Sequence, residues 1–110
     1  MQSDKNNKML HSSIEKQLPE IIKVLKSHKV RRAYAFGSVC TDKFNTESDV
    51  DLLIAFESDE PFNGYAENFW DMEDELKALL NRPVDIVTEK QLKNPYFIKV
   101  LNQTKTPIYE

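Results

Sequence analysis

Cysteine and long apolar runs are nearly absent from this sequence of 110 residues. Its one cysteine, Cys40, excludes an internal disulfide framework and a zinc site built from thiolates, and it fits a reducing compartment. The longest wholly apolar run, residues 52–56, is far shorter than the roughly 20 residues that cross a bilayer, and residues 1–8 lack the apolar core of a signal peptide. We therefore expect a cytoplasmic protein with no membrane partner.

An excess of positive charge is also missing. The 15 lysines and arginines are outnumbered by 18 aspartates and glutamates, which gives a net charge of -3. Proteins that bind nucleic acid in bulk need clustered positive charge to meet the phosphates, so we expect no bulk nucleic-acid binding. The length suits one modest core, and we expect a single domain over residues 1–110, with residues 1–8 disordered.

Apolar residues at helical and strand spacing predict a small mixed fold. Ser12 and Glu15 match a capping box at the start of a first helix. Pro19 then fits either the first residue of a helix to about Ser27 or a kink in a longer helix, and the sequence leaves this open. His28 is expected at the surface or at the end of that helix. Strands are expected at residues 32–36, 50–56 and 84–87, with a short edge strand at 107–109.

A longer amphipathic helix is expected between the second and third strands, because apolar residues from Phe62 to Leu79 recur every three or four positions. Asn81 suits the left-handed end of that helix. Asn94 as cap and Pro95 as first helical residue predict a last helix. The order helix, strand, strand, helix, strand, helix indicates the α/β (α+β) class, a small mixed β-sheet flanked by helices.

Two aspartates lie next to an apolar run that otherwise reads as a buried strand. Asp49 and Asp51 are two positions apart, so on a strand their side chains emerge on the same face, about 7 Å apart. Asp85 interrupts a later apolar strand in the same way. Burying an ionised carboxylate at such a position costs several kcal/mol unless another group compensates its charge. A hard divalent cation is the simplest such group, because carboxylate oxygens are its natural ligands. Because no histidine lies near them in the sequence, Mg²⁺ fits better than zinc.

A Gly-Ser pair ends the first expected strand, and its glycine is one of two in the chain. Gly37 lets the backbone approach a ligand closely, while free N–H groups and the Ser38 hydroxyl can bind phosphate oxygens. Together with three carboxylates of the metal-binding type, the pair indicates a nucleoside-triphosphate site. The backbone and the hydroxyl are expected to hold the outer phosphates, with metal ions at the reacting phosphate.

The spacing of these residues resembles a known family signature. Gly37-Ser38, followed after ten positions by Asp49-x-Asp51 and by a third aspartate in a later strand, is similar to the pattern of the DNA polymerase β-like nucleotidyltransferase superfamily. The compact length and the stretch RPVDIVTEKQL, residues 82–92, narrow the resemblance to the minimal nucleotidyltransferases, the MNT or MntA-like antitoxins. The resemblance covers nearly the whole chain.

This resemblance implies a nucleotidyltransferase fold and an enzyme that transfers a nucleoside monophosphate with two Mg²⁺ ions, AMP from ATP being the expected case. It implies that Asp49 and Asp51 bind the two ions, and that Asp85 completes the metal site and helps activate the acceptor hydroxyl. It also implies that Gly37 and Ser38 hold the β- and γ-phosphates. The implied partner is a helical HEPN-type toxin, which many such proteins inactivate, in some cases by transferring AMP to a tyrosine.

Two other functions stay open at the level of the sequence. Relatives often carry G-S-R-A-R-G where residues 37–42 here read G-S-V-C-T-D, so two arginines are absent. That departure, with the small size, favours a catalytically weak or inactive antitoxin that neutralises its partner by binding. A glycosyltransferase that uses the Asp-x-Asp pair to hold a nucleotide sugar is the third reading, although such enzymes need a much larger scaffold. The acceptor and a possible oligomer are left open.

Overall fold

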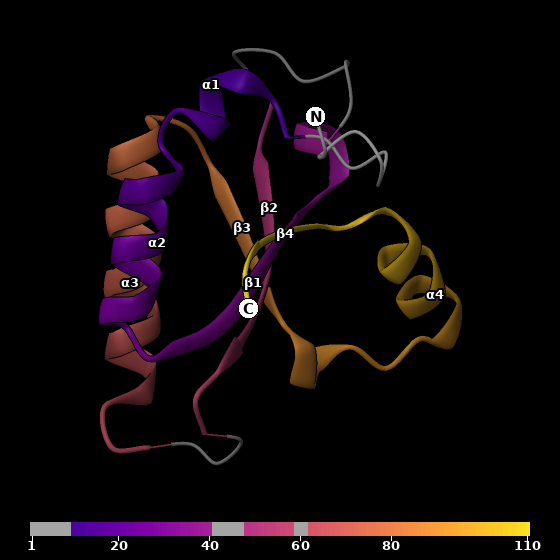
Figure 1. Cartoon of the computed structure of the whole chain (residues 1–110). Coiled ribbons are helices and arrows are strands. Elements are labelled where there is room, and N and C mark those ends of the chain that lie inside the picture. The colour runs from indigo at the N-terminus through magenta and orange to yellow at the C-terminus, as the bar shows by residue number, and fades with distance from the viewer. Residues whose placement is uncertain (1–9, 41–47, 59–61) are drawn as a thin grey trace.

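The structure, a computed structural model, describes residues 10–40, 48–58 and 62–110, with Ser38 and Val39 described by their backbone alone. One sheet divides the molecule, with α2 and α3 on one face and α4 on the other (Figure 1). The helices are α1 (Ser12–Glu15), α2 (Leu18–Ser27), α3 (Tyr65–Leu80) and α4 (Pro95–Thr104). The strands are β1 (Val30–Phe36), β2 (Val50–Phe56), β3 (Val84–Thr88) and β4 (Thr106–Tyr109). Short 3-10 turns follow β1 and β3: η2 (Gly37–Cys40) and η3 (Glu89–Gln91).

The sheet has the strand order β3-β2-β1-β4. β1 pairs antiparallel with both β2 and β4, whereas β2 and β3 run parallel. The helix α3 provides the crossover that two parallel neighbours need. A mixed sheet with helices on both faces confirms the predicted fold class, and the edge strand expected at 107–109 is present as β4.

Alternate residues of the central strands serve two different cores. On the face covered by α2 and α3, Leu52 and Ile54 lie in the larger core. On the face covered by α4, Leu53 packs with Leu101 in a smaller core. Because successive strand side chains point to opposite faces, Asp51 shares the α4 face with Leu53.

The first two helices differ from the expectation at their N-termini. His11 caps α1, since its Nδ1 accepts a hydrogen bond from the backbone N–H of Ser13 at 3.2 Å. The capping-box prediction at Ser12 is therefore wrong, because Ser12 is already the first helical residue. Pro19 is the second residue of α2, which ends at Ser27, so of the two possibilities that the sequence left open the separate helix is present and the kinked helix is not.

The other predicted helix ends are confirmed. Asn81 has φ 55°, in the left-handed region, and ends α3. Asn94 caps α4, because its Oδ1 accepts from two backbone N–H groups of the first turn at 2.9 and 3.2 Å. α3 begins at Tyr65, so Phe62, where the apolar stripe starts, lies before the helix.

Within the described ranges, no helix is long and apolar enough to cross a membrane.

Candidate functional site

The register of the two parallel strands brings two of the predicted aspartates together. Asp51 of β2 pairs with Asp85 of β3, one strand spacing away, or about 5 Å. Their side chains share the α4 face, because paired residues of neighbouring strands point the same way. Asp51 is half-buried and Asp85 is exposed, and Asp49, also exposed, directly precedes β2. The three aspartates thus lie where β2 and β3 begin.

Gly37 meets this site from the end of β1. Phe36, the last residue of β1, pairs with Asp51, so Gly37 follows it at the level of the carboxylates. Gly37 has φ 79°, which side chains rarely adopt, and a Cβ added there would overlap Asp51 Oδ2. Both conformation and space therefore require glycine. Ser38 is the second residue of η2. The position of its hydroxyl lies outside the described part of the chain.

The electrostatics of Asp51 reflect its surroundings. Burial raises the pKa of the Asp51 carboxyl above its usual value, and the negative charges of Asp85 and Asp49 raise it further. Asp51 is thus close enough to both other carboxylates to be repelled by them. A cation bound among them would favour the ionised form and reverse the shift.

The fit of a metal ion can be judged from these ligands. Carboxylate oxygens are what Mg²⁺ prefers in proteins. Across the described residues, however, no set of three or more His, Cys, Asp or Glu side chains makes up a group that could hold a metal ion. The fit rests on Asp51 and Asp85, which are neighbours in register and repel each other. Metal binding by all three aspartates stays a prediction.

Arg82 is a residue at this site that the sequence reasoning missed. Its Nη1 donates a hydrogen bond to the backbone carbonyl of Ser48 at 3.2 Å. Close by, the backbone N–H of Val50 donates to the carbonyl of Pro83 at 3.1 Å. These bonds tie the start of β2 to the start of β3, next to the carboxylates. The available signal was a basic residue shortly before the strand that carries the third aspartate.

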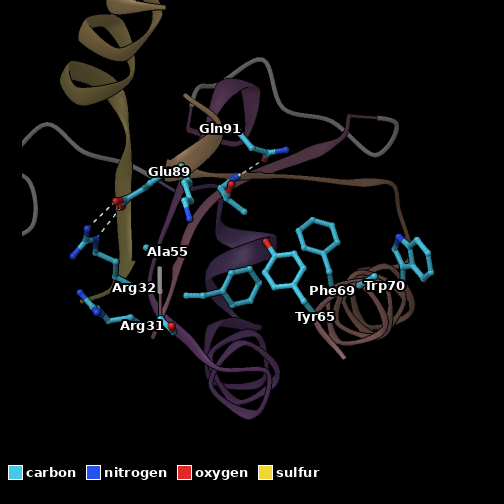
Figure 2. A pocket seen from close by; sticks show the side chains of 13 residues that line it. Arg31, Arg32, Ala55, Tyr65, Phe69, Trp70, Glu89 and Gln91 are labelled. Atoms are coloured by element: carbon cyan, nitrogen blue, oxygen red, sulfur yellow. Dashed lines mark hydrogen bonds and ion pairs between the residues drawn. The ribbon is translucent and has the colours of Figure 1, made fainter. Parts of the chain in front are cut away.

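A cleft of about 690 Å³ opens at the other end of the sheet (Figure 2). Three aromatic residues from the N-terminal half of α3 line it: Tyr65, Phe69 and Trp70. Across the cleft, Arg32 donates two hydrogen bonds to the Glu89 carboxylate, at 2.9 and 2.7 Å, and they lower the pKa of Glu89. Because the cleft lies at the ends of β2 and β3 and the aspartates at their starts, it is not the carboxylate site.

Comparisons with known proteins agree on one family. The profile of the nucleotidyltransferase domain matches residues 16–105. A protein of Thermococcus cleftensis named protein adenylyltransferase MntA is 33% identical over 94 residues, which span 78% of this chain and 91% of that one.

Solved structures match as well. A protein assigned to the minimal nucleotidyltransferases superposes with a TM-score of 0.71 at 26% identity, over 87% of this chain and 93% of that one. A chain from the complex of the tri-AMPylated HEPN toxin of Shewanella oneidensis with an MNT antitoxin gives a TM-score of 0.59 at 18% identity, over 86% of this chain and 71% of that one. At that identity the second match shows a shared fold alone.

Proposed function

Because the chain belongs to the nucleotidyltransferase domain family, as its sequence signature indicates, we propose that it is a magnesium-dependent protein adenylyltransferase. It transfers AMP from ATP to a hydroxyl group on a partner protein. The observation that carries the proposal is the register of β2 and β3, which sets Asp51 beside Asp85, with Gly37 against Asp51. Carboxylates that repel one another favour binding of a metal ion, and the glycine backbone beside them lets a phosphate come close. Both features suit a triphosphate that is bound together with a metal ion.

The proposed step is an in-line displacement at the α-phosphorus of ATP. The acceptor oxygen forms a bond to that phosphorus, the bond to the bridging oxygen breaks, and pyrophosphate leaves with the electron pair. The proton of the acceptor hydroxyl passes to a carboxylate, for which the exposed Asp85 is the candidate. Gly37 and Ser38 hold the β- and γ-phosphates through backbone N–H groups and the serine hydroxyl.

The three aspartates are the residues that would hold two magnesium ions: Asp49, Asp51 and Asp85. When bound, Mg²⁺ supplies positive charge that stabilises the attacking and departing oxygens. The rest of the chain holds these ligands in place. Arg82 and Pro83 fix the strand starts through their hydrogen bonds to the segment around Asp49.

The proposed acceptor is a helical HEPN-type toxin. The Thermococcus relative is named a protein adenylyltransferase, and a structural neighbour comes from a complex with a tri-AMPylated HEPN toxin. Both names support a protein as acceptor. The net charge of -3 agrees, because it offers no general attraction for nucleic acid. The proposed role is neutralisation of that toxin in the cytoplasm.

Labelled ATP tests this function. The protein is incubated with Mg²⁺, the helical protein encoded beside it, and ATP labelled at either the α- or the γ-phosphate. AMP transfer predicts that the partner retains the α-label and not the γ-label. Asp49→Asn and Asp51→Asn should each abolish labelling, since an amide does not replace the charge of a metal ligand. Asp71→Asn, a matched change on the exposed side of α3, should label as wild type does.

A contact-only antitoxin is the second candidate. The observation that favours it is the turn after Gly37, where neither Val39 nor Cys40 offers positive charge to a phosphate. Neutralisation of the toxin that survives both Asp49→Asn and Asp51→Asn, with no label on the partner, would establish this function in place of transfer.

A further inference from the structure

An aromatic side chain of α4 lies over the same face of the sheet as the carboxylates. Tyr96, Phe97 and Val100 are 76%, 41% and 37% exposed, respectively, so α4 presents apolar surface to solvent between its second and sixth residues. Of these residues, Phe97 contacts an aromatic residue of β1. Its ring meets the ring of Phe36 at a centroid distance of 6.4 Å and an interplanar angle of 78°, an edge-to-face contact.

Phe36 connects this ring to the candidate site. It pairs with Asp51 in the antiparallel ladder, so the two side chains share the α4 face at neighbouring positions. Phe36 thus lies between the two residues: its backbone is one strand spacing, about 5 Å, from that of Asp51, and its ring centroid is 6.4 Å from that of Phe97. A triphosphate held at Asp51 and Gly37 would have Phe97 on the same face of the sheet, beyond Phe36, on the side toward α4.

The position of Phe97 is also fixed from its backbone. Its N–H donates to Oδ1 of Asn94 at 3.2 Å, in the cap that starts α4. A ring that is ordered before the ligand arrives loses little conformational entropy when a flat group stacks on it. Tyr96, the next residue back, is turned about 100° away around the helix and does not share this direction.

We propose that the exposed face of Phe97 is the stacking surface for the nucleobase of the nucleoside triphosphate. This inference rests on the proposed nucleotidyl transfer and adds a residue that binds the base rather than the phosphates. Stacking is tolerant of base identity, because every base has a π-face. Phe97 therefore contributes affinity for a nucleotide over inorganic polyphosphate, and little preference among bases.

The contribution of base stacking is measured by comparing a ligand that carries a base with one that carries none. Calorimetry measures the affinity of the whole chain for ATP and for tripolyphosphate, each with Mg²⁺. Phe97→Ala should weaken ATP binding about tenfold, a loss at the low end of what one stacked base contributes. It should leave tripolyphosphate binding unchanged, because that ligand carries no base. Phe97→Tyr keeps an aromatic face and should restore ATP affinity, and Tyr96→Ala should bind both ligands as wild type does.

Three results would overturn the inference, each in a recognisable way. Equal ATP affinity of wild type and Phe97→Ala shows that the base does not stack there. Unchanged ATP affinity with weaker labelling of the partner shows instead that this face of α4 docks the acceptor protein. Wild type that binds neither ligand overturns the proposed function itself. Thermal melting confirms that each variant is folded, and Phe97→Leu replaces Phe97→Ala if the alanine variant is not.

Discussion

Asp51 is the residue at which stability and the proposed function conflict. Its carboxyl is half-buried and close to two other carboxylates, so the folded protein disfavours its ionised form. The unfolded chain imposes no such penalty. In the metal-free protein at neutral pH, ionised Asp51 therefore lowers the free energy of unfolding.

We predict that Asp51→Asn stabilises the metal-free protein by about 0.5–2 kcal/mol at neutral pH, the usual gain when a destabilising feature of a functional site is removed. Because the pKa of Asp51 is higher in the folded than in the unfolded state, the folded protein binds more protons between the two values. Wild-type stability thus falls as pH rises through that interval, and the advantage of the variant should shrink as pH is lowered toward the usual carboxyl pKa.

Urea unfolding with a chelator present, at several pH values, measures this difference. Asp71→Asn serves as the control, because Asp71 is exposed on α3 and its change should leave stability nearly unaltered. An Asp51→Asn protein that is less stable than wild type at neutral pH would show that the aspartate has a structural role.

The two glycines share a backbone conformation but differ in what surrounds them. Gly37 and Gly64 have nearly the same φ, 79° and 80°, so alanine at either position carries a strain of about 1–2 kcal/mol. Only at Gly37 does the added Cβ meet Asp51, since nothing lies within 4 Å at Gly64. Gly37→Ala should therefore lose ATP binding as well as stability, while Gly64→Ala should lose stability alone. Equal ATP binding by the two variants would remove Gly37 from the site.

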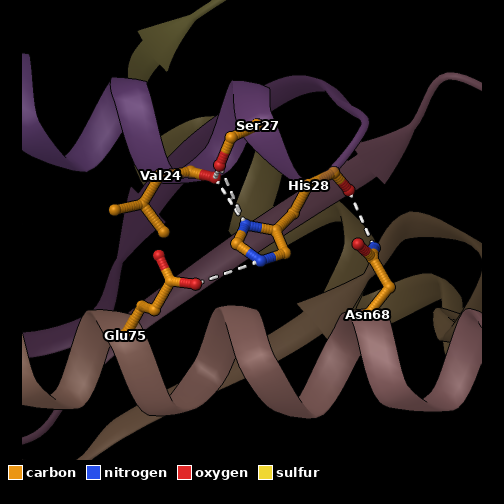
Figure 3. Close-up of polar contacts among 5 residues, drawn as sticks. All are labelled: Val24, Ser27, His28, Asn68 and Glu75. Carbon is orange, nitrogen blue, oxygen red and sulfur yellow. Dashed lines mark hydrogen bonds and ion pairs between the residues drawn. The ribbon is translucent and has the colours of Figure 1, made fainter.

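At the scale of elements, His28 joins α2 to α3 (Figure 3). Its Nδ1 lies 2.8 Å from the carbonyl oxygen of Val24, and because a carbonyl only accepts, Nδ1 donates. Its Nε2 lies 3.3 Å from the carboxylate of Glu75 on α3. The backbone carbonyl of His28 accepts a hydrogen bond from Asn68 Nδ2 at 2.9 Å. The end of α2 is thus fixed against α3 by both side chain and backbone.

We predict that His28→Ala lowers the free energy of unfolding by about 2–3 kcal/mol, because it leaves a cavity where the buried ring packs and removes its hydrogen bond to the Val24 carbonyl. Glu75→Gln should cost at most about 1 kcal/mol, since the Glu75 side chain is 52% exposed and solvent weakens its pairing. Denaturant unfolding of both variants measures the difference. A larger loss for Glu75→Gln would mean that the ion pair, and not burial, carries the contact.

Local signals identified the elements better than the contacts between them. Asn81, Asn94 and Pro95 act within one helical turn, and each was predicted in the role that the structure shows. His28 was expected at the surface or a helix end. It does end α2, but it is 9% exposed, because α3 returns over it from about forty positions later in the chain. Contacts of that range leave no periodic pattern in the sequence.

In the whole molecule, the candidate site also depends on contacts between residues that are far apart in the sequence. The spacing of Asp49 and Asp51 and the glycine at the end of β1 were visible in the sequence. The pairing of Asp51 with Asp85 depends on a parallel register that α3 establishes, and the sequence could not specify it. Arg82 was missed for the same reason, since its acceptor, Ser48, which lies just before β2, is 34 positions away.

The melting temperature with and without ligand decides whether the aspartates and Gly37 form one magnesium-dependent nucleotide site. Wild type and Asp51→Asn are each melted with Mg²⁺ alone, ATP alone, and both. A ligand that binds the folded state alone stabilises it by RT ln(1 + [L]/Kd), about 2.7 kcal/mol at a concentration of 100 Kd. We predict a clear rise in the melting temperature of wild type with Mg²⁺ and ATP together, and loss of most of that rise in Asp51→Asn. No shift for wild type at millimolar Mg²⁺ and ATP, or the same shift in both proteins, would contradict it.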